Sequence, residues 1–363
     1  MCSFDIESCD PAKLRTLKLD AADTPFVRQR IAHAYFEEDI ASTVFLSKAS
    51  FISNKRWQTK SDFPNRKGLI IDARINPYIN ISSLNWNFGK ADNAWMTAIY
   101  FNPDFEVRLF DDDPAIGDNS KPVRTASFRP GAEIFISKVK QFIDTKRKYR
   151  FAYSFKINHH SNGQDGEVFN SEDRLWGKKG FVNTYNGDFS DDLLLAFNAM
   201  VFRNSKDQNH LFFLKTGYST TTGITQQLAQ YKLYGTDRLN LMSSWAWRPL
   251  YRTIINGKKR YDETGYHVER MRIELYTTYI LNPMNVGAIY NLQKAKFTDR
   301  INFHVTGHWR VPGFVAAGLF VETGYYGQDT YNIYLQQSAW FAKFGLSFGL
   351  FKYKQSPILS EGG

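Results

Sequence analysis

The sequence contains only two cysteines, and it has no apolar run long enough to cross a membrane as a helix. Cys2 and Cys9 lie near the N-terminus without a histidine close by, so they do not make a zinc site. They predict either one disulfide in an oxidising compartment or no functional pairing. The apolar stretch from Leu193 to Phe202 is interrupted by Asn198, and a spanning helix requires about 18 apolar residues. A helical membrane protein is therefore excluded.

A signal-peptide pattern is also missing from the first residues. The segment from Met1 to Asp23 is charged and has no apolar core of the required length. If the protein is exported, we expect this sequence to be a processed or trimmed form. Thr24-Pro25 fits the start of a helix, and apolar residues with helical spacing follow it up to Glu38. This pattern predicts a short helix, or alternatively an extended arm, within an N-terminal segment of residues 1–48.

Aromatic residues, in contrast, are abundant. The chain of 363 residues contains 30 Phe, 20 Tyr and 8 Trp, an aromatic share of 16%, against 23% charged residues. Its mean hydropathy is nevertheless negative. This mixture is too aromatic for a disordered chain and too polar for a helical membrane protein, so it favours a β-rich fold.

The net charge of +10 permits a phosphate-bearing partner, either a nucleic acid or anionic lipid head groups. The basic residues are scattered along the chain, and the densest cluster, Lys146 to Arg150, leads into a predicted strand. We interpret this cluster as a solvated loop or strand end and not as a dedicated phosphate site, and we expect no nucleic-acid partner.

After Phe51 the sequence becomes a succession of segments of about ten residues, separated by polar or glycine-bearing turns. In the segment 339–351, bulky apolar residues occupy the even positions, while residues 343–349 place small or polar side chains at the odd ones. A strand that crosses a bilayer at a tilt needs about 9–11 residues. We predict an all-β, antiparallel transmembrane β-barrel over residues 49–353, with a C-terminal tail at residues 354–363.

The barrel is expected to have about 12 strands. The candidate segments outnumber the strands, because neighbouring candidates such as 93–103 and 105–111 can be halves of one long strand. Other candidates include 172–184, 226–234 and 284–297. A soluble β-sandwich with a bulky core face is the alternative fold.

One strand candidate, from Arg150 to Ser161, alternates almost perfectly. Because side chains in a strand point to opposite faces with period two, its odd positions share one face. They are Phe151, Tyr153, Phe155, Ile157, His159 and Ser161. A base and a nucleophile would then continue an apolar stripe, as an enzyme requires if its substrate comes from a lipid layer. His160 belongs to the opposite face and is interpreted as a polar residue of the barrel interior.

The run His159-His160-Ser161-Asn162-Gly163 ends this strand, and Asp173-Arg174-Leu175-Trp176 begins twelve residues beyond Ser161. The pair Phe128-Arg129 lies upstream. In these residues the chain resembles the outer-membrane phospholipase A family, whose members carry His-x-Ser-Asn-Gly followed by Asn-Arg-Leu-aromatic. The resemblance covers residues 125–176 best, residues 315–350 less closely, and the rest of the chain only in pattern.

The resemblance implies a role for each matching residue. Ser161 would attack an acyl ester of a phospholipid, with His159 as the base that accepts its proton. Asp173 would be the third member of the triad, where the family usually has Asn. Gly163 matches the glycine whose backbone N–H stabilises the oxyanion.

The resemblance further implies a calcium ion, a homodimer and a location in a bacterial-type outer membrane. Gln164 would offer its backbone carbonyl to the ion. The family's ligand serine falls at Phe169, and only a shift of two residues brings in Ser171. The partner subunit would contribute from near Thr125 or Ser127.

Two other functions remain open on the sequence alone. One is a non-enzymatic outer-membrane barrel, such as a pore or a homologue that has lost its activity, because Asp173 and the calcium serine depart from the family's pattern. The other is a soluble β protein that binds acidic ligands.

Overall fold

The computed structural model describes most of the predicted barrel. The described residues are 47–52, 69–86, 94–110, 123–143, 149–171, 179–183, 187–205, 209–249, 252–255, 258–261, 266–311, 317–327, 339–348 and 352–354. Within these ranges, no helix is long and apolar enough to cross a membrane. The helix predicted after Thr24 and most of the C-terminal tail lie outside the described residues, as does Asp173.

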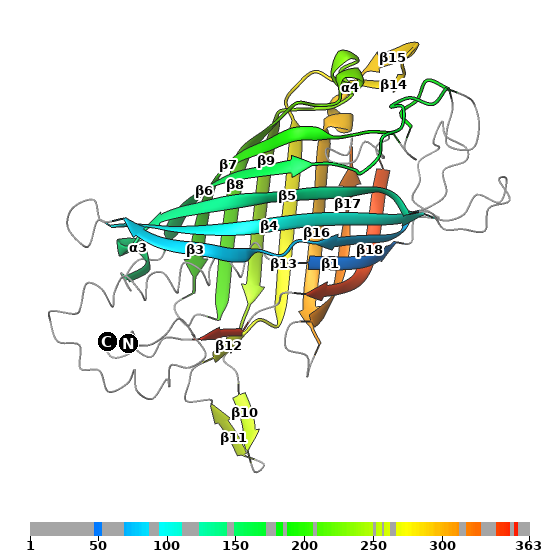
Figure 1. The fold of residues 1–363 in the computed structure, drawn as a ribbon. Helices are drawn as coiled ribbons and strands as arrows, with labels where there is room; N and C mark the ends of the chain where they lie inside the picture. Colours follow the sequence, from blue (N-terminus) through cyan, green and yellow to red (C-terminus); the bar gives the residue numbers. More distant parts are fainter. Residues whose placement is uncertain are drawn as a thin grey trace.

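One large antiparallel sheet forms the molecule (Figure 1). Its strands are β1 (Ser47–Ile52), β2 (Leu69–Ile75), β3 (Ile79–Trp86), β4 (Trp95–Phe110), β5 (Val123–Lys138), β6 (Arg150–His160), β7 (Asp191–Asn204), β8 (His210–Thr222), β9 (Arg238–Trp247), β13 (Met271–Ile280), β16 (Ile301–Arg310), β17 (Ala317–Tyr326) and β18 (Ala339–Phe348).

The sheet closes on itself as a barrel. The first strand, β1, pairs with the last barrel strand, β18, and with β2, and β2 in turn pairs with β4. The long strand β4 pairs with β3 along its first half and with β2 along its second half, so β2 and β3 share one position in the wall. Thirteen strands, two of which share a position, therefore give a ring of twelve. The predicted antiparallel barrel of about 12 strands is confirmed.

Smaller elements lie at the two ends of the barrel (Figure 1). One end carries α4 (Gln226–Gln230), β14 (Asn285–Ala288) and β15 (Asn291–Lys294), and the 3-10 helix η4 (Phe297–Arg300) leads from them into β16. The other end carries β10 (Arg252–Ile255), β11 (Lys258–Tyr261), β12 (Tyr266–Val268) and β19 (Lys352–Lys354). A short helix, α3 (Lys140–Ile143), follows β5. The first of these ends is called the α4 end below.

Some of the predicted segments are not barrel strands. The segment 226–234 begins with helix α4, and its Leu228 and Leu233 are buried in an apolar cluster with loop residues such as Val168. That strand prediction is wrong, because these side chains pack beneath loops and not on a sheet face. In the segment 172–184, the described residues form only one isolated bridge, from Val182 to Phe169. The segment 284–297 contains the separate hairpin of β14 and β15.

The side chains of the wall are distributed as in a membrane barrel. Large apolar residues are exposed on its outer side along many strands, among them Phe151, Tyr153, Phe212, Leu214, Leu319, Val321, Phe344 and Leu346. The inner side instead buries charged residues such as Glu133, Arg272, Glu274, Glu322 and Lys343. A soluble protein places its apolar face inside, so this inverted pattern matches an apolar outer wall in lipid and disfavours the sandwich.

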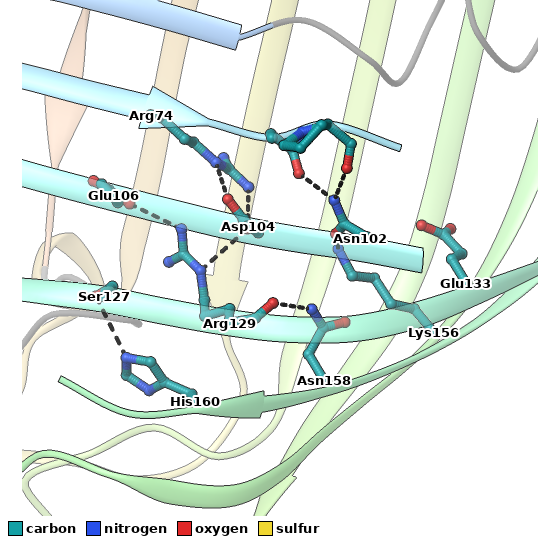
Figure 2. Close-up of polar contacts among 12 residues, drawn as sticks. Arg74, Asn102, Asp104, Glu106, Ser127, Arg129, Glu133, Lys156, Asn158 and His160 are labelled. Atoms are coloured by element: carbon teal, nitrogen blue, oxygen red, sulfur yellow. Dashed lines mark hydrogen bonds and ion pairs between the residues drawn. The ribbon is translucent and has the colours of Figure 1, made fainter. Parts of the chain in front are cut away.

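The lumen is filled by side chains of two kinds. Towards α3, an apolar cluster that includes Met96, Phe135 and Phe202 occupies the interior. Nearer the α4 end, Arg129 bonds to both Asp104 and Glu106, and Arg74 bonds to Asp104 through two nitrogens (Figure 2). A cavity of about 280 Å³, lined mostly by polar and charged residues, remains between these groups and the opposite wall. These interior ion pairs thus connect β2, β4 and β5 on the inner side of the wall.

Candidate active site on the outer wall

The alternation of β6 places the two histidines on opposite sides of the wall. His159 is exposed on the outer side, two residues beyond Ile157, whereas His160 is buried in the lumen. Ser161 extends the strand by one more residue, because its backbone N–H and C=O both pair with Phe128 of β5. His159 and Ser161 therefore lie on the outer wall as the sequence predicts, and His160 points inward.

The neighbouring strand β7 contains a bulge at this level. Asn158 pairs with Leu194, but the next paired residue of β6, His160, is opposite Asp191. Two steps on β6 thus match three steps on β7, and Asp192 and Leu193 are both exposed in succession. A bulge of this kind interrupts the ladder and frees backbone groups for other contacts.

The bulge supplies a partner for the candidate base. The backbone carbonyl oxygen of Asp192 lies 3.1 Å from Nδ1 of His159. A carbonyl only accepts hydrogen bonds, so this contact requires the proton on Nδ1 and leaves the lone pair on Nε2. A general base needs such a lone pair. Sequence reasoning missed Asp192, and no signal in the sequence marks it, because it acts through its backbone.

Ser161 and Gly163 form a local contact of their own. The Gly163 N–H donates to Oγ of Ser161 at 3.0 Å, and Gly163 has a φ of +66°, in the left-handed region that favours glycine. No hydrogen bond joins His159 to Ser161 among the described residues. Rotating the Ser161 side chain toward His159 would break its contact with Gly163, and the freed N–H could then bind a developing oxyanion.

Asn162, between these two residues, fixes the loop to the barrel. Its side chain is buried, and its Nδ2 donates to the carbonyl of Gly187 at 2.6 Å. Its Oδ1 accepts from the backbone N–H of Phe189 at 3.2 Å and of Gln164 at 3.4 Å. Asn162 stands in the family motif without a role of its own, so the sequence did not predict this anchoring.

The structure places two of the residues that the resemblance assigns to calcium on one loop. Gln164 and Ser171 are exposed on one loop, and Thr125 is placed only through the backbone of β5. Calcium takes about 6–8 oxygen ligands, and the described residues contain no group of three or more His, Cys, Asp or Glu that could hold a metal ion. Gln164, Ser171 and Thr125 alone are too few to complete such a coordination sphere, and the calcium site stays a prediction.

Comparisons with known proteins bear on the fold alone. No family model and no curated protein matches the chain. A solved structure of the β domain of the Bordetella autotransporter BrkA is similar with a TM-score of 0.32 and 9% identity, over 85% of this chain and 96% of that one. OmpT, an outer membrane protein of Vibrio cholerae, is similar with a TM-score of 0.27 and 8% identity, over 84% and 94%.

These similarities are too distant to assign a family. The assignment of the fold rests on the strand pairing and on the apolar outer wall of this chain itself. The predicted bacterial-type outer-membrane location agrees with that architecture, and the chain has the fold of an outer-membrane β-barrel.

Proposed function

We propose that this barrel is an esterase of the membrane surface, which hydrolyses acyl ester bonds of phospholipids with Ser161 as nucleophile and His159 as general base. The observation that carries the proposal is the position of His159. Its imidazole is exposed on the lipid-facing wall, next to Ser161, and its Nδ1 contacts the Asp192 carbonyl. This contact orients Nε2 as the proton acceptor.

The surroundings of the site favour a lipid substrate. Exposed apolar side chains, including Ile157 and Phe128, lie on the wall beside the two residues. Tyr218 is exposed on the outer wall at the same end of the barrel, and its hydroxyl donates to Asp237. Tyrosines of this kind mark the boundary between hydrocarbon and head groups, which is the depth at which the ester bonds of a phospholipid lie.

The proposed reaction has two halves. As Oγ of Ser161 attacks the ester carbonyl carbon, its proton passes to Nε2 of His159, and the oxyanion is met by the freed N–H of Gly163. The tetrahedral intermediate collapses, the C–O bond to the alcohol breaks, and His159 returns the proton to the departing lysophospholipid. Water then attacks the acyl-enzyme with His159 again as base, and the fatty acid is released.

A calcium ion and a homodimer belong to this proposal through the resemblance. The loop of Gln164 and Ser171 would supply only part of a coordination sphere, so further ligands would have to come from water, from other residues or from the partner subunit. Asp173 belongs to the proposal as the third member of the triad, where it would stabilise the charged imidazole of His159. Hydrolysis measured against increasing chelator tests the ion. Full activity in excess chelator contradicts the calcium requirement and leaves the roles of Ser161 and His159 intact.

A second candidate function is a barrel without enzymatic activity. The observation in its favour is that Oγ of Ser161 accepts a hydrogen bond from Gly163, while no hydrogen bond joins it to His159 among the described residues. Such a barrel would retain the wall and the lumen but would not hydrolyse lipid. A pore is the less favoured version, because ion pairs and apolar side chains fill much of the described lumen.

The two candidates are separated by fatty-acid release from phospholipid–detergent micelles. We expect Ser161→Ala and His159→Ala each to lower kcat by at least about 10³-fold. Ser243→Ala, which removes the hydroxyl of a serine on a different strand, β9, is the matched control and is expected to retain activity. Equal rates for wild type and Ser161→Ala, or no release by the wild type, would favour the non-enzymatic barrel.

A further inference from the structure

We propose that the β7 bulge at Asp192 and Leu193 positions His159, and that Asp191 and Gly223 are positioning residues that hold this bulge from the two sides of the barrel wall. The inference rests on the proposed function, because it assigns to the bulge the orientation of the catalytic base. It extends that function with two residues that touch neither the substrate nor the reacting atoms.

On the inner side, Asp191 is anchored in a buried polar cluster. Its Oδ2 lies 3.4 Å from Nδ1 of His160 and accepts a hydrogen bond of 3.3 Å from the Tyr234 hydroxyl. Nε2 of His160 lies 3.4 Å from Oγ of Ser127 on β5 (Figure 2). All four residues are buried. The cluster thereby ties β5, β6 and the segment before β9 to the first residue of β7.

On the outer side, Gly223 packs directly against Asp192. Gly223 follows β8, where Thr222 pairs with Leu193, and it has a φ of +62°. A Cβ at this position would lie 1.8 Å from Oδ2 and 2.6 Å from Cβ of Asp192. A residue with a Cβ would therefore both strain the backbone and displace Asp192, so the observed place of the bulge requires a glycine here.

Together, the two contacts fix where the Asp192 carbonyl points. Its neighbour Asp191 is held in the lumen, while its own side chain is confined by Gly223 outside, and the carbonyl between them faces His159. The Nδ1 proton thus has an acceptor within the barrel wall itself. The predicted third member of the triad, Asp173, lies outside the described residues, so the Asp192 carbonyl is the acceptor that the structure shows for Nδ1.

Gly223→Ala and Asp191→Ala test the two sides of the bulge. A displacement of about 1 Å at a catalytic group lowers rates by about 10²-fold, so we expect kcat to fall by about 10- to 100-fold with KM changed less than about threefold. Asp191→Asn, which keeps one acceptor oxygen, should recover part of this loss.

Two controls separate positioning from general damage. Gly287→Ala alters another glycine of positive φ, in β14, and Glu322→Gln alters another buried acid of the lumen. Both are expected to retain kcat. Migration of unheated samples on a denaturing gel checks that every variant is a folded barrel.

A readout that does not depend on activity completes the test. In protein labelled with ¹⁵N-histidine, the His159 signal, assigned with His159→Gln, should report a proton on Nδ1 in the wild type and a mixture of tautomers in Gly223→Ala. An unchanged tautomer and kcat in both bulge variants would overturn the proposal. A wild type that does not hydrolyse phospholipid would refute the proposed function. The tautomer of His159 in the wild type and in Gly223→Ala would then still show whether the bulge orients the imidazole.

Discussion

The backbone carbonyl of Asp192 and Nδ1 of His159 lie 3.1 Å apart on the outer wall of the barrel. This contact joins β6 and β7 at the bulge, where the regular pairing of the two strands is interrupted. The backbone carbonyl that the bulge leaves unpaired in the ladder orients the imidazole of His159. The relationship explains how a base can be held on a wall that faces lipid. The orienting group is a backbone carbonyl and not a carboxylate.

The turn after Ser161 should be sensitive to the loss of its glycine. Gly163→Ala forces a residue with a Cβ into the left-handed region, which costs about 1–2 kcal/mol. The ring of Phe128 lies 3.4 Å from the position of the new Cβ, an ordinary contact, so the effect should come from the backbone. We expect the free energy of unfolding to fall by that amount and kcat to fall more than KM changes. Chemical unfolding and steady-state kinetics measure the two effects.

Unaltered kinetics in a folded Gly163→Ala variant would contradict the assignment of its N–H to the oxyanion. Gly180→Ala is the comparison for the kinetics, because Gly180 also has positive φ, although its new Cβ would have to displace the exposed ring of Tyr290. It should lower stability and retain kcat in the folded fraction.

Asn162 should matter for both stability and catalysis. Asn162→Ala removes three hydrogen bonds and leaves the buried Gly187 carbonyl and Phe189 N–H without this partner. An unsatisfied buried group costs about 1–3 kcal/mol, so the unfolding free energy should fall by at least that much. The freed loop should also lower kcat, since Ser161 and Gly163 flank the altered residue.

The control for this prediction is Asn285→Ala, which removes a side-chain bond to the Tyr231 carbonyl in the hairpin region. It should lower stability without lowering kcat in the folded fraction. If Asn162→Ala behaves in the same way, the anchoring of the loop has no bearing on catalysis.

Two arginines of the lumen contact the same carboxylate, and we expect them to contribute unequally to the stability of the barrel. Arg129 is 2% exposed in its side chain and bonds to Asp104 and Glu106, whereas Arg74 is 46% exposed and bonds to Asp104. Removing one partner of a buried ion pair costs about 3–5 kcal/mol, and an exposed pair contributes about 1 kcal/mol or less. Arg129→Ala should therefore destabilise the barrel several times more than Arg74→Ala in denaturant unfolding. Equal losses would show that the lumen is more hydrated than its burial indicates.

The filled lumen also predicts that the barrel is not an open channel. The described interior retains a cavity of about 280 Å³ between charged side chains and an apolar cluster. In planar bilayers we expect no steady single-channel conductance from the wild type. Reproducible open-channel steps would support the pore version of the second candidate.

The sequence predicts this fold and part of the site for a definite physical reason. Alternation with period two is a local property, so the facing of His159, His160 and Ser161 follows from the strand they belong to. The outward position of His159 was predicted in this way. The catalytic roles themselves stay predictions.

The remaining features depend on pairing between strands. Nothing in the run Asp191-Asp192-Leu193-Leu194 shows that two successive residues face outward, because the bulge is defined only by the register against β6. The contact of Ser161 with Gly163 likewise depends on a rotamer, which residue types alone do not specify. In the segment 226–234, the apolar residues suit a strand, but in the structure they pack against loop residues beneath the loops.

The most direct test of the central claim is covalent labelling of the nucleophile. A fluorophosphonate with a long alkyl chain reacts with a serine only where a base activates it in a site open to lipid. Peptide mass mapping after incubation should locate one adduct, on Ser161, in the wild type and in Ser243→Ala. His159→Ala should abolish it. Absence of an adduct in the wild type, an adduct on another residue, or full labelling of Ser161 without His159 would contradict the account.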